Sequence, residues 1–307
     1  MSKTAFIFPG QASQNVGMGK DIYESFDLAK EYYDKADEVL GQQISKLSFE
    51  GPLEKLTETH VTQPAIFTLS VILFKLLQRE NASVAMVSGH SLGEYSALVA
   101  AGAIDFETGL HLVKVRSQAM QDACERRPGT MAAIIGLEES KVAEACTAAH
   151  SQGIVQPANY NSPGQIAISG EVDAVREAMQ HAKEMGARRA IELVVGGAFH
   201  SPLMSSAKVA VEDALEDVDF IDAEIPVYVN VSGKPLQKSD ALKSALIEQI
   251  DHPVLWMQTI ENMIKDKADT FREVGPGTVL TGLMRRIDKE KSAESISSYR
   301  DIIRFKE

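Results

Sequence analysis

The pentapeptide GHSLG at residues 89–93 constrains the fold more than any other feature of the chain. It follows a short apolar run at 84–87, and the segment after it, 94–101, has helical character. A serine between two glycines at a strand-to-helix junction is typical of a nucleophile elbow, whose sharp turn exposes the hydroxyl. The helix that begins there brings N–H groups close to that hydroxyl. The pattern favours Ser91 as a nucleophile, with an ordinary turn serine as the alternative.

Strands and helices alternate on both sides of a central segment with a different rhythm. Apolar periodicity predicts helices at 26–40, 64–79 and 106–123, and residues 130–194 read as β-α-β-β-α-β, the ferredoxin-like order. We therefore expect an α/β fold with a hydrolase-like parallel-sheet core and an inserted ferredoxin-like small domain. The predicted boundaries assign 1–125 and 196–307 to a discontinuous catalytic core, and 126–195 to the insert.

Composition excludes several classes of function. The net charge of −12 disfavours nucleic-acid and membrane-surface binding, which need a basic excess. The apolar stretch 65–77 is interrupted by polar residues, so it does not predict a membrane span, and the apolar run near the N-terminus is too short for a signal peptide. Cys124 and Cys146 lack metal-ligand spacing. We expect no metal site and a reduced, cytoplasmic protein.

A serine nucleophile needs a base, which is usually a histidine. Among the seven histidines, His200 follows the sequence GGAF and precedes Ser201 and Pro202, which places it on a loop at a helix start. Catalytic groups gather on such loops. The position predicts His200 as the base, although a structural histidine fits the same place.

A set of ordered motifs now points to a family. The pieces are FPGQASQ at 8–14, TQPA at 62–65, GHSLGE at 89–94, Arg116, NSPGQ at 161–165, GAFHS at 197–201, Gln249, HPV at 252–254 with Trp256, and EVGPG at 273–277. In these residues the chain resembles the malonyl-CoA:acyl-carrier-protein transacylases, the acyltransferase family of fatty-acid synthesis. It is similar also to the acyltransferase domains of polyketide synthases.

The resemblance implies a ping-pong reaction. Ser91 would attack the thioester of malonyl-CoA and become a malonyl-O-serine, which the phosphopantetheine thiol of an acyl carrier protein then attacks. His200 would serve as base and acid, held by the main-chain carbonyl of Gln249. Gln11 and the N–H of Leu92 would form the oxyanion hole. Malonyl-CoA and the carrier protein are substrates, and no cofactor is implied.

Arg116 stands out among the substrate-binding residues that the resemblance implies, because a guanidinium can hold the free malonyl carboxylate with two hydrogen bonds. Phe199 would crowd an α-methyl group, which favours malonyl over methylmalonyl. Met120, His90 and Asn161 complete the expected substrate site.

Two residues depart from the family pattern. Ala12 stands where the family usually has glycine, which is harmless unless the residue needs a positive φ. Leu255 stands where an arginine is common.

An acidic carrier protein would meet an acidic chain, so attraction has to be local. Three arginine pairs are candidates for a docking patch, at 126–127, 188–189 and 285–286. A monomer is expected. The alternatives are a discrete acyltransferase of a polyketide synthase, a serine thioesterase or hydrolase, and a carrier-binding module without activity. The sequence does not separate fatty-acid from polyketide synthesis.

Overall fold

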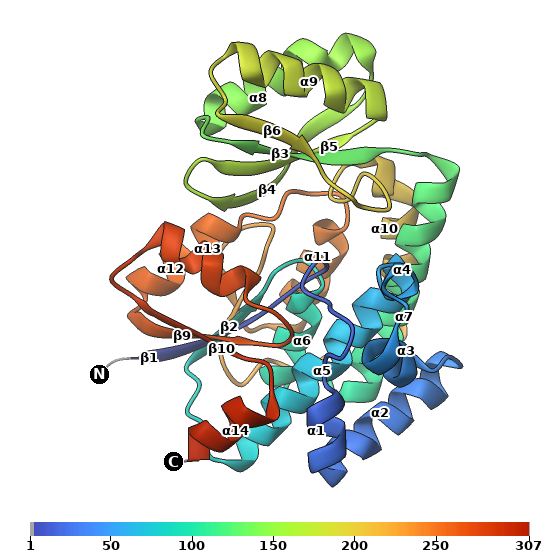
Figure 1. Cartoon of the computed structure of the whole chain (residues 1–307), viewed down its shortest axis with the longest axis vertical. Coiled ribbons are helices and arrows are strands. Elements are labelled where there is room, and N and C mark those ends of the chain that lie inside the picture. Colours follow the sequence, from blue (N-terminus) through green and yellow to red (C-terminus); the bar gives the residue numbers. More distant parts are fainter. Residues whose placement is uncertain (1–2, 307) are drawn as a thin grey trace.

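The computed structural model describes residues 3–306, which form two sheets, one above the other in Figure 1. The larger sheet has the strand order β10-β9-β1-β2-β7-β8. All neighbours are parallel except β7 and β8. Its strands are β1 (Lys3–Phe8), β2 (Met86–Gly89), β7 (Val227–Tyr228), β8 (Pro235–Leu236), β9 (Ala268–Val274) and β10 (Ser292–Ile296). The expected mostly parallel sheet is confirmed.

Helices cover both faces of this sheet. Successive side chains of β1 point to opposite faces and pack against the helices there. Ala5 and Ile7 pack with α12 (Trp256–Lys265) and α13 (Val279–Ile287). Phe6 and Phe8 belong to the larger core on the other face. The helices that contribute to that core are α1 (Lys20–Ser25), α2 (Asp27–Leu40), α3 (Ile44–Glu50), α4 (Leu53–Leu56), α5 (Thr59–Arg79), α6 (Gly93–Ala100), α7 (Phe106–Arg126), α10 (Ser205–Glu216), α11 (Ser239–Gln249) and α14 (Tyr299–Lys306).

Helix α5 is the central helix of the large core. It is long and apolar enough to cross a membrane, but most of it is buried inside the protein, as in the core helix of a globular domain. It begins at Thr59, five residues before the predicted start at Pro64. Its extra turn carries Thr62 and Gln63, both buried. The early start therefore brings polar side chains into the core.

The smaller sheet has its own core. Its elements follow the predicted order: β3 (Thr130–Ile135), α8 (Glu139–Ala148), β4 (Val155–Ser162), β5 (Gln165–Gly170), α9 (Val172–Glu184) and β6 (Arg189–Glu192). The strands pair antiparallel in the order β4-β5-β3-β6, the ferredoxin-like arrangement. Figure 1 shows α8 and α9 on the face turned away from the large sheet, with β4 nearest to it. The boundaries at 125/126 and 195/196 remain predictions; α7 ends at Arg126.

Local pattern misjudged several loops and ends. Strand β7 is limited to Val227–Tyr228, because the chain turns directly after it, with the N–H of Val229 donating to the carbonyl of Lys234. The pattern did not predict β10 or α14. Ala12 has a φ of 81°, in the left-handed region. Its methyl group is therefore strained at a position where the family usually has glycine.

The close approach of α6 to β1 yields the first prediction. A Cβ at Gly93 would overlap the main-chain carbonyl of Phe8, and neither backbone can move without disturbing the sheet. Gly93→Ala should therefore lower the free energy of unfolding by about 3 kcal/mol, measured by urea denaturation. Gly282→Ala is the matched control, since nothing lies within 4 Å of its added methyl group. It should raise stability by about 0.5–1 kcal/mol. Wild-type stability of Gly93→Ala would contradict the packing argument.

Candidate active site

The turn between β2 and α6 lifts Ser91 above the sheet. Ser91 has a φ of 53°, a left-handed conformation that costs a non-glycine residue about 1–2 kcal/mol. A Cβ at Gly89 would overlap the main chain of Gly93, so only glycine lets the strand and the helix meet this closely. The two glycines of the motif thus allow the turn, and the turn presents the serine hydroxyl.

Ser91 lies beside His200, although 109 residues separate them in sequence. The serine Oγ and the histidine Nε2 are 2.8 Å apart, and Nδ1 lies 2.8 Å from the main-chain oxygen of Gln249. A carbonyl oxygen only accepts, so Nδ1 carries the proton and Nε2 is free to accept from Ser91. Gln249 is the last residue of α11, where helix carbonyls lack partners within the helix. The helix end therefore supplies the orienting acceptor.

His200 is kept neutral by its surroundings. It is 3% exposed and has a φ of 57°. Burial, and next the nearby charge of Arg116, lower its pKa from 6.5 to about 3. The imidazole is consequently in its base form at neutral pH, and an added proton would need a compensating negative charge.

Arg116 is a fully buried cation next to the nucleophile. One guanidinium nitrogen, Nη1, donates to Gln63 Oε1 at 2.6 Å, and Nη2 donates to Ser91 Oγ and Gln249 Oε1, each at 3.0 Å. Its Nε has no partner, and within residues 3–306 no carboxylate lies at ion-pair distance from it. Burial lowers its pKa, and the arginine remains charged. This arrangement is suited to receiving an anion from outside.

Residues of the small sheet and residues of the larger α/β part both line the hollow above Ser91, which measures about 220 Å³. The predicted residues Gln11, Leu92, Met120, Phe199, His90 and Asn161 all line it. His90 Nε2 lies 2.9 Å from Asn161 Oδ1, which joins the elbow to β4. Met131, Ala167, Leu193 and Val195 make much of the remaining wall apolar. Eight of the ten predicted site residues thus line one hollow, and the other two, Arg116 and Gln249, lie behind it in hydrogen-bond contact with Ser91, while the roles of all ten remain predictions.

Sequence reasoning assigned no role to three polar residues around the site. Gln63 and Glu94 stand inside quoted motifs, and Asn230 stands outside them. Each is buried, and Asn230 accepts a hydrogen bond from the N–H of Ser91 at 2.7 Å. Burial raises the pKa of Glu94 to about 7, while hydrogen bonding from the N–H of Asn230 acts in the opposite direction. A polar residue in an apolar helix could have drawn attention to Gln63; nothing local distinguishes Asn230.

The other reactive side chains lie apart from this chemistry. Burial raises the pKa of Cys124 to about 11 and that of Cys146 to about 12, so both thiols stay protonated. Within the described part of the chain, no group of three or more His, Cys, Asp and Glu side chains could hold a metal ion.

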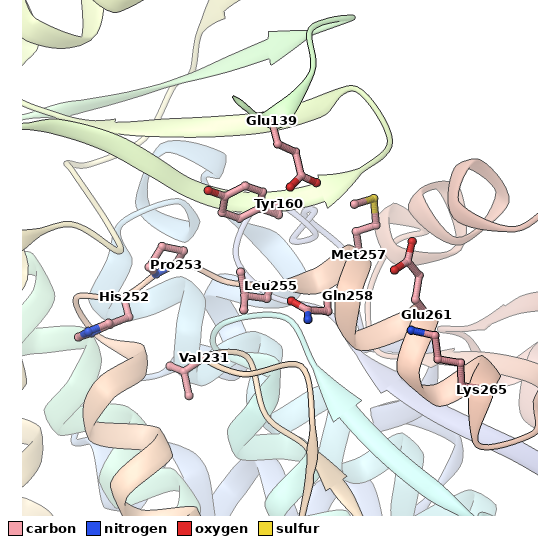
Figure 2. A pocket seen from close by; sticks show the side chains of 10 residues that line it. All are labelled: Glu139, Tyr160, Val231, His252, Pro253, Leu255, Met257, Gln258, Glu261 and Lys265. Carbon is pink, nitrogen blue, oxygen red and sulfur yellow. The ribbon is translucent and has the colours of Figure 1, made fainter. Parts of the chain in front are cut away.

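A second hollow, of about 650 Å³, lies between the small sheet and α12 (Figure 2). Tyr160 lines it, whereas its neighbours on β4, Asn159 and Asn161, line the hollow above Ser91. Leu255, the second departure from the family pattern, also lines this outer hollow, together with Glu139. The leucine at this position therefore alters the outer hollow and not the hollow above Ser91.

A serine beside a neutral histidine on an α/β core is an arrangement that serine hydrolases and acyltransferases share. Residues 5–304 match the acyl transferase domain. The chain belongs to this family and is an acyltransferase.

The relatives agree along nearly the whole chain. It is 42% identical to the malonyl CoA-acyl carrier protein transacylase of Bacillus subtilis, over 97% of this chain and 94% of that protein. The crystal structure of an acyl carrier protein S-malonyltransferase from Vibrio cholerae has a TM-score of 0.94 and 41% identity, with 99% of each chain covered. A malonyl-transacylase in complex with a type II PKS acyl-carrier protein has a TM-score of 0.95 and 39% identity, with 98% of each chain covered.

The pKa of His200 leads to a pH prediction. Because that pKa is about 3, the imidazole should stay neutral as the pH falls from about 8 to about 5, a range in which a free histidine becomes protonated. NMR of histidine-labelled protein would follow the ring, and loss of one resonance in His200→Ala would assign it. Titration of that resonance near the ordinary value of 6.5 would contradict the effect of burial.

Proposed function

We propose that this acyltransferase moves the malonyl group from malonyl-CoA to the phosphopantetheine thiol of an acyl carrier protein. The observation that carries the proposal is the buried guanidinium of Arg116, 3.0 Å from the hydroxyl of Ser91. An acyl group bound to Ser91 would place a carboxylate two carbons away beside that cation. Acetyl groups would leave the cation unpaired, which is costly in a buried site.

In the first half-reaction, Ser91 Oγ bonds to the thioester carbon while its proton passes to His200 Nε2. Leu92 N–H and Gln11 are the proposed donors to the oxygen that becomes negative. When the tetrahedral intermediate collapses, the carbon–sulfur bond breaks and the coenzyme A thiolate takes the proton from His200. The malonyl group is then an ester of Ser91.

The second half-reaction runs the same steps in reverse. The carrier-protein thiol gives its proton to His200 and bonds to the ester carbon, and Ser91 leaves with that proton. A neutral carbonyl at Nδ1 stabilises imidazolium less than a carboxylate would. The bound malonyl carboxylate offsets part of this weakness, since it neutralises the charge of Arg116, which after burial is the second cause that lowers the pKa of His200. The substrate thereby makes its own base stronger.

Several further properties belong to the same proposal. Phe199 lines the hollow and would crowd an α-methyl group, so malonyl is favoured over methylmalonyl. The similar transacylase seen with a carrier protein supports that class of partner. Arg286 reaches Gln165 on the wall of the hollow at 2.8 Å, which makes its arginine pair the best placed for a docking patch. We propose a cytoplasmic monomer.

The covalent intermediate provides the direct test. Incubation with malonyl-CoA should add the mass of one malonyl group to the intact protein, and Ser91→Ala should abolish the addition. Release of the group to an acyl carrier protein, rather than to water, separates a transferase from a thioesterase. If the wild type forms no adduct and malonyl-CoA stays intact, a carrier-binding module without activity is supported instead.

Arg116 should determine the choice of acyl group. Arg116→Ala should reduce malonyl transfer by about 100-fold, because a buried charge-assisted contact is lost, and should raise the relative rate with acetyl-CoA. The ratio of kcat/KM for the two donors is the measurement. Arg126→Ala, at the exposed end of the same helix, is the control and should keep the wild-type ratio. An unchanged ratio in Arg116→Ala would refute carboxylate recognition by this residue.

A further inference from the structure

Asn230 lies under the nucleophile elbow and is fully buried. It follows the short strand β7, which pairs with β2, and this pairing brings it beside the turn. Its side-chain Oδ1 accepts from the N–H of Ser91 at 2.7 Å, and its Nδ2 donates to the carbonyl of Gly89 at 2.7 Å. One amide thus holds the turn on both sides of the serine, as a neighbouring peptide would.

The conformation of Ser91 makes such support necessary. A left-handed serine persists only where its surroundings favour it over relaxed alternatives. If the elbow relaxed, Ser91 Oγ would move away from His200 Nε2, now 2.8 Å distant. The N–H of Leu92, the next residue, would turn with it. A displacement of about 1 Å at reacting atoms costs on the order of 100-fold in rate.

Glu94 holds Asn230 in place. The main-chain N–H of Asn230 donates to Glu94 Oε2 at 2.7 Å, and Glu94 is 1% exposed. Glu94 lies in the first turn of α6, so the helix that follows the elbow anchors the residue that supports it. The main-chain oxygen of Asn230 accepts from Leu255 N–H at 2.9 Å. These two contacts hold the main-chain N–H and the main-chain carbonyl of Asn230.

The side chain of Gln249 links this support to the rest of the site. Its Nε2 donates to the main-chain oxygen of Ser91 at 2.9 Å and lies 3.4 Å from Asn230 Oδ1. Its Oε1 accepts from Arg116, while its main-chain oxygen faces His200. The elbow, the cation and the base therefore share one buried network.

We infer that Asn230, anchored by Glu94, is a positioning residue that keeps Ser91 in its reactive left-handed turn. The role rests on the proposed function only in that Ser91 is taken as the nucleophile. Both side-chain hydrogen-bonding atoms of Asn230 are directed to the main chain of the elbow, at Ser91 and Gly89, so it acts through Ser91 and not through the substrate. Its loss should slow acylation without weakening the binding of malonyl-CoA.

The test uses a fluorophosphonate probe, which phosphonylates an activated serine with loss of fluoride and reads Ser91 whatever the natural acyl donor. Asn230→Ala should react about 100-fold more slowly than the wild type, with KM for malonyl-CoA unchanged. Asn262→Ala is the control, because Asn262 donates to the carbonyl of Gly233 away from the elbow, and it should react like the wild type. Equal labelling of folded Asn230→Ala and wild type would overturn the inference.

Glu94 variants separate anchoring from charge. Glu94→Gln keeps an oxygen acceptor for the N–H of Asn230 and should react close to the wild-type rate, whereas Glu94→Ala should be about 10-fold slower. Equal rates for these two variants would overturn the anchoring role.

A second variant covers the case in which Asn230→Ala does not fold. Asn230→Asp keeps the size and the acceptor toward Ser91 but loses the donor toward Gly89, and in mildly alkaline buffer it should also be slow; a wild-type rate would overturn the inference. If the wild type reacts with the probe at Ser91 but takes no malonyl group, the proposed function fails while the positioning role is still decided by these variants.

Discussion

The close contact of α6 with β1 and β2 at Gly89 and Gly93 is the constraint on which the rest of the site depends. Because neither glycine has room for a Cβ, the helix starts against the end of the sheet, and the chain between them turns sharply. In that turn Ser91 adopts a strained, left-handed backbone conformation. Once the hydroxyl stands above the sheet, His200, Arg116 and the hollow can be arranged around it.

Burial is the main influence on the electrostatics of His200 and Arg116. His200 is a weak base, because a neutral carbonyl holds its Nδ1 and burial lowers its pKa. The charge of Arg116 lowers that pKa further. Within residues 3–306 the hydrogen-bonding partners of the same cation are neutral, and the proposed substrate would bring it an anion. Recognition and activation would then be one event: the carboxylate that fits Arg116 also allows His200 to hold a proton.

The two sheets divide the work of forming the hollow. Ser91 follows β2 of the large sheet, and the small sheet supplies much of the apolar wall together with Asn159 and Asn161. The small sheet has its own core, while Met131 and Ala167, which line the hollow, pack with the large core. The wall of the hollow is therefore part of the contact between the two sheets.

The sequence by itself determined the elbow, the alternation of strands and helices, and the ferredoxin-like order of the insert. These features arise from interactions between residues near each other in the chain, such as the glycines of the turn and the apolar periodicity of helices. The local setting predicts Ser91 and His200 as the reacting pair, while the roles predicted for Arg116 and Gln249 depend on the resemblance to a family. Only the tertiary structure placed Asn230 under Ser91, 139 residues away, assigned Leu255 to an outer surface, and gave Ala12 its positive φ. Contacts across such separations depend on strand order and loop path, and these leave no periodic pattern in the sequence.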